Sequence, residues 1–462
     1  MSRSSAGLAA LLVVAVLAPA VALAAWPGRP GGGGDDTYQF ASGFGEQVDV
    51  TVTATADGAR VMLPTAATKP WDTALLGVRV TAPATSGDPY IDLTVGTTRV
   101  RQHLDPGARG LRWLNLTGLH AQLVPGTVVD LRPSAARVEV GPARLRLFAS
   151  KLPLDGRILV LAPHPDDAEI AAFGLYAERN ATIVTVTSGN AGDANYAAEF
   201  PVPAEQYRMK GYLRAVDSVT VPWQGGIPPQ RCFNLGYFDA RLEEMRNAPT
   251  AVMPEVYGPN IDTSVYRRAN LGRLLPVGPR ANKWANLVQD LEAILRKVRP
   301  QVVVMPHPML DDHADHQNVT VAAVEAMRRW NGRARFLLYT NHAARNLYPY
   351  GPAGTSAALP PWSGPALPVQ AIYAHPVPPD LQRRKLYALE SMHDLRLSPA
   401  EQQTCTQPGA QPRRPDYPRS QTDYFRRGPR PEEIFFAFDR KGLEELMQLY
   451  LQGPPPAPAA TR

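Results

Sequence analysis

The sequence holds few of the residues and segments that mark several common classes of protein. It has two cysteines in 462 residues, Cys232 and Cys405, and no Cys-x-x-Cys motif, which excludes a sulfur-ligated metal site. An exported protein can pair two such cysteines, and the sequence leaves open whether they are paired or separate thiols. The net charge of +6 comes from scattered Arg residues rather than a basic tract with interleaved aromatics, so no nucleic-acid partner is predicted.

Long apolar runs are also absent, except at the N-terminus, where the pattern is that of a secretory signal peptide. Arg3 precedes the run LAALLVVAVLAPAVALA, and the sequence ALA at 22–24 offers a small-x-small cleavage site. We expect residues 1–25 to be removed and the mature protein to be periplasmic or extracellular, with no transmembrane span. An uncleaved N-terminal membrane anchor is the alternative, because the run approaches the roughly 20 residues that span a bilayer.

Changes in the predicted secondary structure along the chain indicate two folded domains. The 47 prolines and 36 glycines predict many loops, while a hydrophobic content of 44% excludes wholesale disorder. Residues 26–36 form a Pro/Gly linker, and 37–150 hold many short strand patterns separated by turn residues, which predicts an all-β, sandwich-like domain. Residues 151–450 alternate strand and helix patterns, which predicts an α/β domain with a doubly wound, mostly parallel, Rossmann-like sheet. The tail at 451–462 is expected to be disordered.

Four apolar segments are the candidate parallel strands of the α/β domain: RILVLA, ATIVTVT, VTVPW and QVVVMP. The β domain has no His/Asp/Glu cluster, and Trp71 and Trp113 are interpreted as core residues. Its role stays open between glycan recognition and a purely structural part, because sandwich folds serve both.

The densest polar cluster follows the first of these strands. Residues 157–169 read RILVLAPHPDDAE, in which the apolar strand ends at Pro163 and His164, Asp166 and Asp167 follow at once. A helical pattern begins directly afterwards, so these side chains lie between the carboxyl end of a strand and the start of a helix. Ligands bind in that crevice in open α/β sheets.

A second stretch, residues 301–316, repeats this arrangement with the sequence QVVVMPHPMLDDHADH. Its strand ends at Pro306, and six His and Asp residues follow: His307, Asp311, Asp312, His313, Asp315 and His316. Since the carboxyl ends of parallel strands meet at one edge of a sheet, the two clusters can face each other and share a metal ion.

The spacing of the residues within the two clusters predicts a site for metal-assisted hydrolysis. His164 and Asp167 are three residues apart at a turn and can reach one point, and a histidine of the second cluster completes a His₂Asp set with the open position of a catalytic zinc. Such an ion activates water and polarises a carbonyl. Asp166 then remains available as a base.

Two histidines of the second cluster, His313 and His316, are three residues apart, so that one can bind the metal while the other faces the substrate. A histidine held by Asp315 can stay protonated and stabilise an oxyanion or protonate a leaving amine. Each motif alone is weak, because such residues often cap helices or turns. Two clusters behind two buried strands favour a metal site, and we interpret His307 and His342 as outer groups or hydrogen-bonded loop histidines.

Together, APHPDDAE and the later HADH resemble the anchor motifs of the PIG-L/LmbE family of zinc-dependent N-acetylglucosaminyl deacetylases. The resemblance covers about residues 155–440. Weaker similarities follow in the order of the family: TVTSGNAGD, YRMKGYLRAVDSV, LGYFDARL, RRKLYALESMHDL and FRRGPRPEEIF. The β domain lies outside the common core of the family.

Carried over to this sequence, the resemblance implies zinc on His164, Asp167 and His316, with another divalent ion such as Fe²⁺ as an alternative. It implies Asp166 as the general base and His313 as the electrostatic or acid partner.

The resemblance further implies that Asp315 orients the acid partner and that Arg208 and Asp239 bind sugar hydroxyls. Two positions depart from the usual pattern. Gly211 stands where many members have Glu, which puts details of the substrate pocket in doubt, whereas Ala168 between Asp167 and Glu169 disturbs nothing essential.

The motifs and the signal peptide together predict an exported enzyme that removes the N-acetyl group from an N-acetylglucosamine-type sugar in a glycan, glycolipid or glycoconjugate. Export argues against soluble cytosolic substrates. One alternative is an amidase that removes a larger acyl group from an amino-sugar conjugate. Another is a non-catalytic carbohydrate-binding envelope protein, although the intact pair of clusters counts against it.

Overall fold

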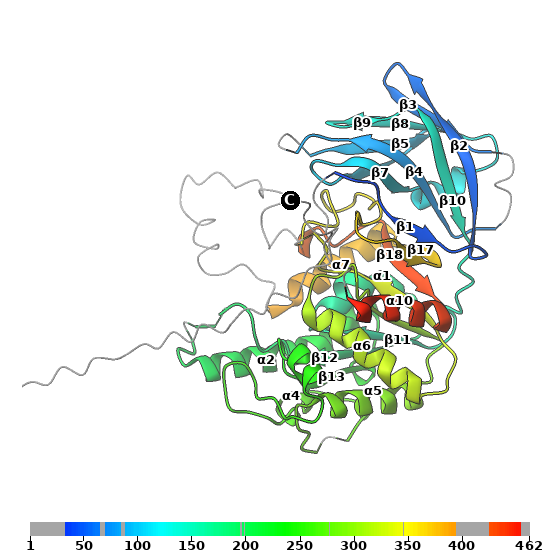
Figure 1. Ribbon diagram of the computed structural model, residues 1–462. Coiled ribbons are helices and arrows are strands. Elements are labelled where there is room, and N and C mark those ends of the chain that lie inside the picture. Colours follow the sequence, from blue (N-terminus) through cyan, green and yellow to red (C-terminus); the bar gives the residue numbers. More distant parts are fainter. Residues whose placement is uncertain are drawn as a thin grey trace, which may run out of the picture.

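The computed structural model describes residues 33–453, apart from 65–69, 85–87, 195, 198, 277, 345 and 394–424 (Figure 1). The predicted signal peptide, most of the predicted linker, most of the predicted tail, and Cys405 lie outside the described residues. Whether Cys405 pairs with Cys232, which the sequence leaves open, is therefore not tested; Cys232 itself is buried.

The N-terminal part forms one antiparallel sheet of nine strands, in the order β6-β5-β8-β3-β2-β10-β4-β7 with β9 paired to β4. The strands are β2 (Gly45–Thr55), β3 (Gly58–Met62), β4 (Thr73–Thr81), β5 (Tyr90–Val95), β6 (Thr98–His103), β7 (Arg109–Asn115), β8 (Val128–Ser134), β9 (Arg137–Val138) and β10 (Gly141–Phe148). The all-β texture predicted from the sequence is confirmed.

This sheet folds back on itself instead of forming the two separate layers of a sandwich. Strand β2 pairs with β3 through one end and with β10 through the other, so it belongs to both halves. Strand β9 follows β8 of one half and pairs with β4 of the other. Side chains of both halves, among them Val61, Leu76 and Val129, form one buried cluster. Trp113 is buried as predicted, whereas Trp71 is only half-buried.

The C-terminal part is mixed α/β, which confirms the predicted class. Its seven-stranded sheet has the order β13-β12-β11-β14-β15-β18-β17. The first five strands are parallel, and the last two run antiparallel to their neighbours. The strands are β11 (Ile158–Ala162), β12 (Ala181–Thr187), β13 (Cys232–Tyr237), β14 (Val302–Pro306), β15 (Arg335–Tyr339), β17 (Ala371–Pro376) and β18 (Glu432–Phe438).

Helices connect these strands and pack along the sheet. Helix α1 packs against α7, and α5 packs against α6. The amphipathic pattern predicted for residues 284–298 is confirmed in α5, where the large apolar side chains from Trp284 to Leu295 are buried and Val298 is half-buried. The helices are α1 (Asp167–Ala177), α2 (Pro203–Thr220), α3 (Leu242–Asn247), α4 (Ser264–Arg267), α5 (Trp284–Val298), α6 (Ala314–Arg329), α7 (Pro379–Ser391) and α10 (Arg440–Gln452).

One predicted strand is wrong. The segment VTVPW forms the end of α2 and the start of the 3₁₀ turn η2 (Val221–Gly225), and β13 is the strand at this edge. Val219 and Val221 are buried, so their β-branched side chains serve packing rather than strand pairing.

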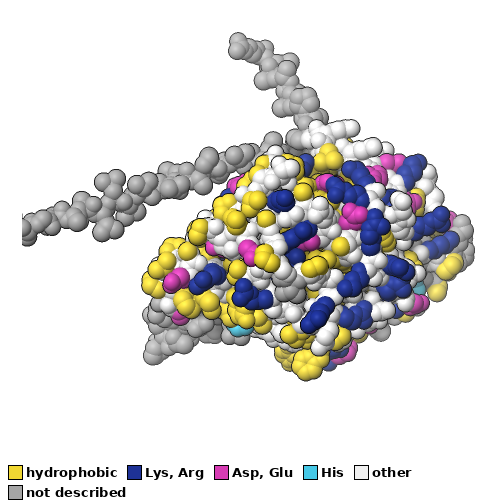
Figure 2. All heavy atoms as spheres, turned by 90° about the horizontal axis from the view of Figure 1, so that it is seen from below, with side chains coloured by type: hydrophobic (Ala, Val, Ile, Leu, Met, Phe, Trp, Pro, Cys, Tyr) yellow, Lys and Arg dark blue, Asp and Glu magenta, His cyan; other side chains and the backbone are white. Residues whose placement is uncertain are grey.

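The two parts of the chain pack together. Strand β1 (Tyr38–Phe40) pairs in parallel with β16 (Leu367–Val369). Phe148 of the β sheet lies in the same hydrophobic cluster as the α/β core. The predicted domain boundaries remain predictions. Within the described residues, no helix combines the length and apolarity needed to cross a bilayer. On the face in Figure 2, Lys and Arg side chains are distributed among hydrophobic and uncharged ones.

A buried ion pair is expected to stabilise the α/β part strongly. Lys385 Nζ of α7 lies 2.8 Å from Glu433 Oε1 of β18, with side chains 2% and 3% exposed. Glu433 also accepts backbone N–H groups of Gly174 and Leu175 in α1. Lys385→Met leaves this carboxylate without its cation, so we expect the free energy of unfolding in urea to fall by about 3–5 kcal/mol.

Lys441→Met is the matched control, because Lys441 Nζ lies 3.7 Å from Glu445 in a pair whose side chains are 85% and 56% exposed. We expect little change in this variant. Similar losses in both lysine variants would contradict a special role for the buried pair.

Candidate metal centre

The two His/Asp clusters lie at the same edge of the sheet because their strands are neighbours. Strands β11 and β14 are parallel and adjacent, with Ile158 paired to Val302 and Val160 to Val304. The chain leaves both strands at their carboxyl ends and enters α1 and α6. This is the point at which the order of the strands reverses direction, where α/β sheets bind ligands.

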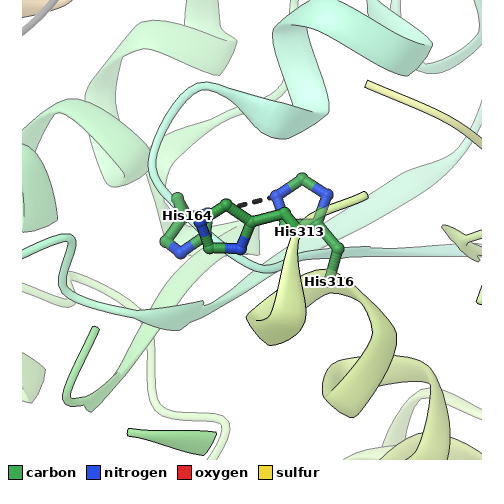
Figure 3. Close-up of side chains that lie close together, drawn as sticks. All are labelled: His164, His313 and His316. Carbon is green, nitrogen blue, oxygen red and sulfur yellow. Dashed lines mark hydrogen bonds between the residues drawn. The ribbon is translucent and has the colours of Figure 1, made fainter. Parts of the chain in front are cut away.

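Three potential ligand atoms converge at this edge. His164 Nδ1 lies 3.2 Å from His316 Nε2 and 3.3 Å from Asp167 Oδ2. His316 Nε2 lies 3.1 Å from the same Asp167 oxygen. Figure 3 shows His164 and His316 facing each other, with His313 beside them. The predicted convergence of the two clusters is therefore present.

The donor set fits a zinc ion. Zinc bonds to His nitrogen and Asp oxygen of about 2.0–2.1 Å place tetrahedral ligand atoms about 3.3–3.4 Å apart. The three distances among these atoms, 3.1–3.3 Å, are close to that spacing. Two imidazoles and one carboxylate also suit other divalent ions, Fe²⁺ among them.

Each imidazole is oriented by a carboxylate on its other nitrogen. His316 Nδ1 lies 3.0 Å from Asp311 Oδ2, and His164 Nε2 lies 3.1 Å from Asp239 Oδ1. Such a carboxylate fixes the tautomer and aims the opposite nitrogen at the metal. Asp311 was part of the second cluster in the sequence, but no role could be assigned to it there.

The ligand Asp167 is held at both oxygens. Its Oδ2 accepts the backbone N–H of His164 at 2.8 Å, and its Oδ1 accepts from Asn341 Nδ2 at 2.7 Å. Asn341 follows β15, the neighbour of β14, so it reaches this edge for the same reason as the clusters. Sequence reasoning missed it because a single Asn after a strand is a weak signal.

The buried carboxylates of the site favour a cation at its centre. Burial lowers the pKa of both imidazoles, but neighbouring carboxylates outweigh it, and they raise the pKa of His316 to about 9 and that of His164 well above its usual value. The pKa of Asp167 is held well below its usual value by the two rings despite burial. The raised pKa values of the two rings show that the carboxylates favour positive charge at this point, which a bound metal would supply.

Other combinations in this cluster also bring one ligand atom from each side chain within 4.8 Å of the others: His164–His313–His316, Asp167–His316–His342 and His164–Asp239–Asp315. The set of His164, Asp167 and His316 is favoured because the second nitrogen of each ring and the second oxygen of the carboxylate already have hydrogen-bond partners. In contrast, His313 Nδ1 accepts the backbone N–H of Asp315 at 3.2 Å, so the proton of the neutral ring is on Nε2, the nitrogen that would have to bind the metal.

This contact corrects the predicted role of Asp315. Its carboxylate does not orient His313 but accepts the backbone N–H groups of Ala240 at 2.8 Å and Leu242 at 3.3 Å. His313 is held by the backbone of Asp315 because it is the N-cap of α6. Burial and the neighbouring rings lower the pKa of His313 well below its usual value, which disfavours the predicted protonated state.

The predicted base, Asp166, occupies a strained backbone position directly before α1, with φ of 136°. Its Oδ2 lies 3.1 Å from Arg214 Nη2, which also donates to the carbonyl of Pro165 at 2.9 Å. Arg214 thus holds both the peptide and the carboxylate. Gly189 leaves room for this guanidinium, because a Cβ at that position, where φ is +67°, would lie 2.7 Å from Arg214 Nη1.

The arginine chosen from the sequence, Arg208, is on the same helix α2 but exposed. Within the described part of the chain, no hydrogen bond or ion pair joins it to the metal cluster. Asp239 does belong to the cluster: besides His164, it contacts Ala191 N at 3.3 Å through Oδ2. Sugar binding by Arg208 and Asp239 remains a prediction.

The remaining histidines differ in role. His307 is fully buried, its Nδ1 accepts the backbone N–H groups of Met309 and Leu310, and burial lowers its pKa to about 3. It is a hydrogen-bonded loop histidine, one of the two roles expected. The His342 ring lies 4.7 Å from that of His316, with Nδ1 2.8 Å from Asn346 Oδ1.

Residues 159–327, which include both clusters, match the family model described as PIG-L, GlcNAc-PI de-N-acetylase. This region belongs to the PIG-L family. The family supports an enzyme of the N-acetylglucosamine deacetylase type or a related hydrolase acting on glycoconjugates of that sugar.

Solved structures add little to this assignment. GalB, the 4-carboxy-2-hydroxymuconate hydratase from Pseudomonas putida KT2440, is 14% identical, with 52% of this chain and 79% of that chain covered and a TM-score of 0.27. The CBM22-1–GH10 modules of xylanase 10B from Clostridium thermocellum are 9% identical, with 65% and 82% covered and a TM-score of 0.17. Both TM-scores are too low to carry an argument. No curated protein matches the chain.

The apparent affinity for zinc is expected to rise with pH between about 6 and 9. The pKa of His316 is about 9 in the metal-free site, so below that pH a proton must leave the ring as the ion enters. Each bound proton that is displaced weakens the affinity up to about tenfold per unit of falling pH. Competition with a chromophoric chelator at several pH values measures this slope.

Asp311→Asn tests the cause of the slope, because Asp311 is one of the carboxylates that raise the pKa of His316. We expect zinc affinity about 10–100-fold lower at pH 8 and a flatter pH dependence. A wild-type affinity that does not change with pH would contradict this account of the ligands.

Proposed function

We propose that this protein is an exported, zinc-dependent deacetylase that removes the N-acetyl group from an N-acetylglucosamine-type sugar in a glycan, glycolipid or glycoconjugate. The observation that carries the proposal is the convergence of His164, Asp167 and His316 within 3.1–3.3 Å inside the segment that belongs to the PIG-L family. The proposal of export rests on the signal-peptide pattern at residues 1–25, which lie outside the described residues.

His164, Asp167 and His316 would hold the ion, which would supply the Lewis acidity that activates a water molecule and polarises the amide carbonyl. Asp166 is next to a ligand in the chain and is fixed at Oδ2 by Arg214. We assign it the task of taking the proton of the attacking water and returning it to the nitrogen of the leaving amine.

His313 is suited to stabilise the oxyanion as a neutral hydrogen-bond donor. Its Nδ1 accepts the backbone N–H of Asp315, so the proton of the neutral ring is on Nε2. Its ring centroid lies 4.7 Å from that of His164 and 5.0 Å from that of His316. A donor at this position meets the charge that develops on the carbonyl oxygen during attack.

Asp166→Asn is expected to retain zinc and lose turnover. The amide can still accept from Arg214 but cannot take a proton, so we expect acetate release from chitooligosaccharides to fall by about 10²–10⁴-fold. Elemental analysis measures the metal content of the same samples. Asp155→Asn is the control, since the Asp155 side chain is fully exposed and pairs with Arg179. Release of acetate by Asp166→Asn at the wild-type rate would show that the base is wrong.

His313→Ala separates the donor role from a ligand role. If His313 donates to the oxyanion, kcat falls by about 10²–10³-fold while the zinc content stays at the wild-type level. Loss of zinc together with activity would instead favour the ligand set that includes His313.

A further inference from the structure

A cavity of about 410 Å³ lies at the end of the nine-stranded sheet where β2 begins and β10 ends (Figure 1). This volume falls in the range of about 300–1,000 Å³ that small-molecule sites occupy. Two aromatic side chains, Phe44 and Trp71, line the cavity together with Glu46 and Lys151. Among the described residues that line it, none is a candidate metal ligand, so the cavity is separate from the metal centre.

The indole of Trp71 is held in a fixed position at this cavity. Its ring packs edge-on against that of His120, with centroids 4.2 Å apart, and its carbonyl oxygen lies 3.1 Å from His120 Nε2. The next residue, Asp72, is tied to the end of β10, since its N–H donates to the carbonyl of Phe148 at 2.8 Å and its Oδ2 accepts the N–H of Ser150 at 2.7 Å. The half-buried indole is thus ordered before a ligand arrives, and little side-chain entropy is lost on binding.

The second aromatic wall, Phe44, is placed by the start of β2. Gly45 pairs with β10, and a Cβ at this position would lie 2.7 Å from the carbonyl oxygen of Leu147. The absence of a side chain at Gly45 therefore lets the chain that carries Phe44 lie close to β10. Phe44 packs against the hydrophobic cluster of the α/β part, whereas Trp71 packs against that of the nine-stranded sheet. The two rings are anchored in different cores, with the cavity between them.

The charged groups at the cavity favour a neutral ligand that is rich in hydroxyl groups. Glu46 is half-buried and Lys151 is exposed. A hydroxyl group can donate to a carboxylate and accept from an ammonium group, whereas an anion or a cation would meet one side chain with a charge of its own sign. The C–H face of a pyranose ring also packs well on an indole or a phenyl ring. Aromatic walls with one carboxylate and one ammonium group therefore suit a sugar.

We propose that this cavity is a glycan-binding site at the nine-stranded sheet, in which sugar rings pack on Trp71 and Phe44 and form hydrogen bonds with Glu46 and Lys151. The identity of the ligand as the N-acetylglucosamine-type glycan rests on the proposed function. A chain held at a second site stays close to the enzyme between catalytic events, which raises the effective concentration of its N-acetyl groups at the metal centre.

Calorimetric titration of chitotetraose into the full zinc-loaded chain, with Asp166→Asn in every protein to prevent turnover, tests the site. We expect two binding events, one at the metal centre and one at the cavity. Trp71→Ala is expected to weaken only the second event, by at least about tenfold, whereas Trp71→Phe retains an aromatic wall and most of the affinity. Lys151→Met, at an exposed position, is expected to weaken the same event about 3–10-fold.

Trp223→Ala is the matched control, because Trp223 is 70% exposed in η2 and does not line the cavity. A single binding event in the parent protein, or equal behaviour of the two alanine variants, would overturn the site. If circular dichroism shows that Trp71→Ala is unfolded, an unchanged second event in Lys151→Met overturns it instead.

The site and the proposed function can fail separately. Trp71-dependent binding of chitotetraose, without acetate release from any acetylated sugar by the wild type, would leave the glycan site standing and refute the deacetylase. Acetate release by the wild type, without any Trp71-dependent binding, would do the reverse.

Discussion

The site depends on the parallel pairing of β11 with β14. This pairing brings His164 and His316, which are 152 residues apart in the chain, to a hydrogen-bond distance of 3.2 Å. Neither cluster alone offers three ligand atoms at metal-binding distances. The register of two buried strands thus determines whether a divalent ion can be held.

Hydrogen bonds from surrounding polar side chains fix the orientation of the candidate ligands. Asp311 and Asp239 each hold the outer nitrogen of one imidazole, while Asn341 holds the ligand carboxylate. So many buried acidic groups repel one another unless protons or a metal compensate them. Asp166, with its strained backbone and its ion pair with Arg214, belongs to the same polar network. It is an ionisable group beside the candidate ligands but is not itself one of them.

The sequence sufficed to predict that these three side chains converge because they follow a simple rule. The two clusters that contain His164, Asp167 and His316 follow apolar strand segments, and the carboxyl ends of parallel strands meet at one edge. The same rule explains Asn341, but one amide after a strand gives too little signal. Arg214 lies in the middle of a helix, where only packing decides which side chain reaches the site. Likewise, the contact of Asp315 with His313 depends on how α6 begins, and the sequence pattern does not specify whether backbone or carboxylate makes it.

Similar reasons account for the fold. Alternating strand and helix patterns identified the α/β class, whereas the antiparallel strands β17 and β18 and the folded nine-stranded sheet depend on long-range pairing. The most direct test of the account is anomalous diffraction from crystals of the zinc-loaded protein. One peak within about 2.0–2.2 Å of His164 Nδ1, Asp167 Oδ2 and His316 Nε2 is predicted. A peak between Asp239 and Asp315, or none in this cluster, would contradict it.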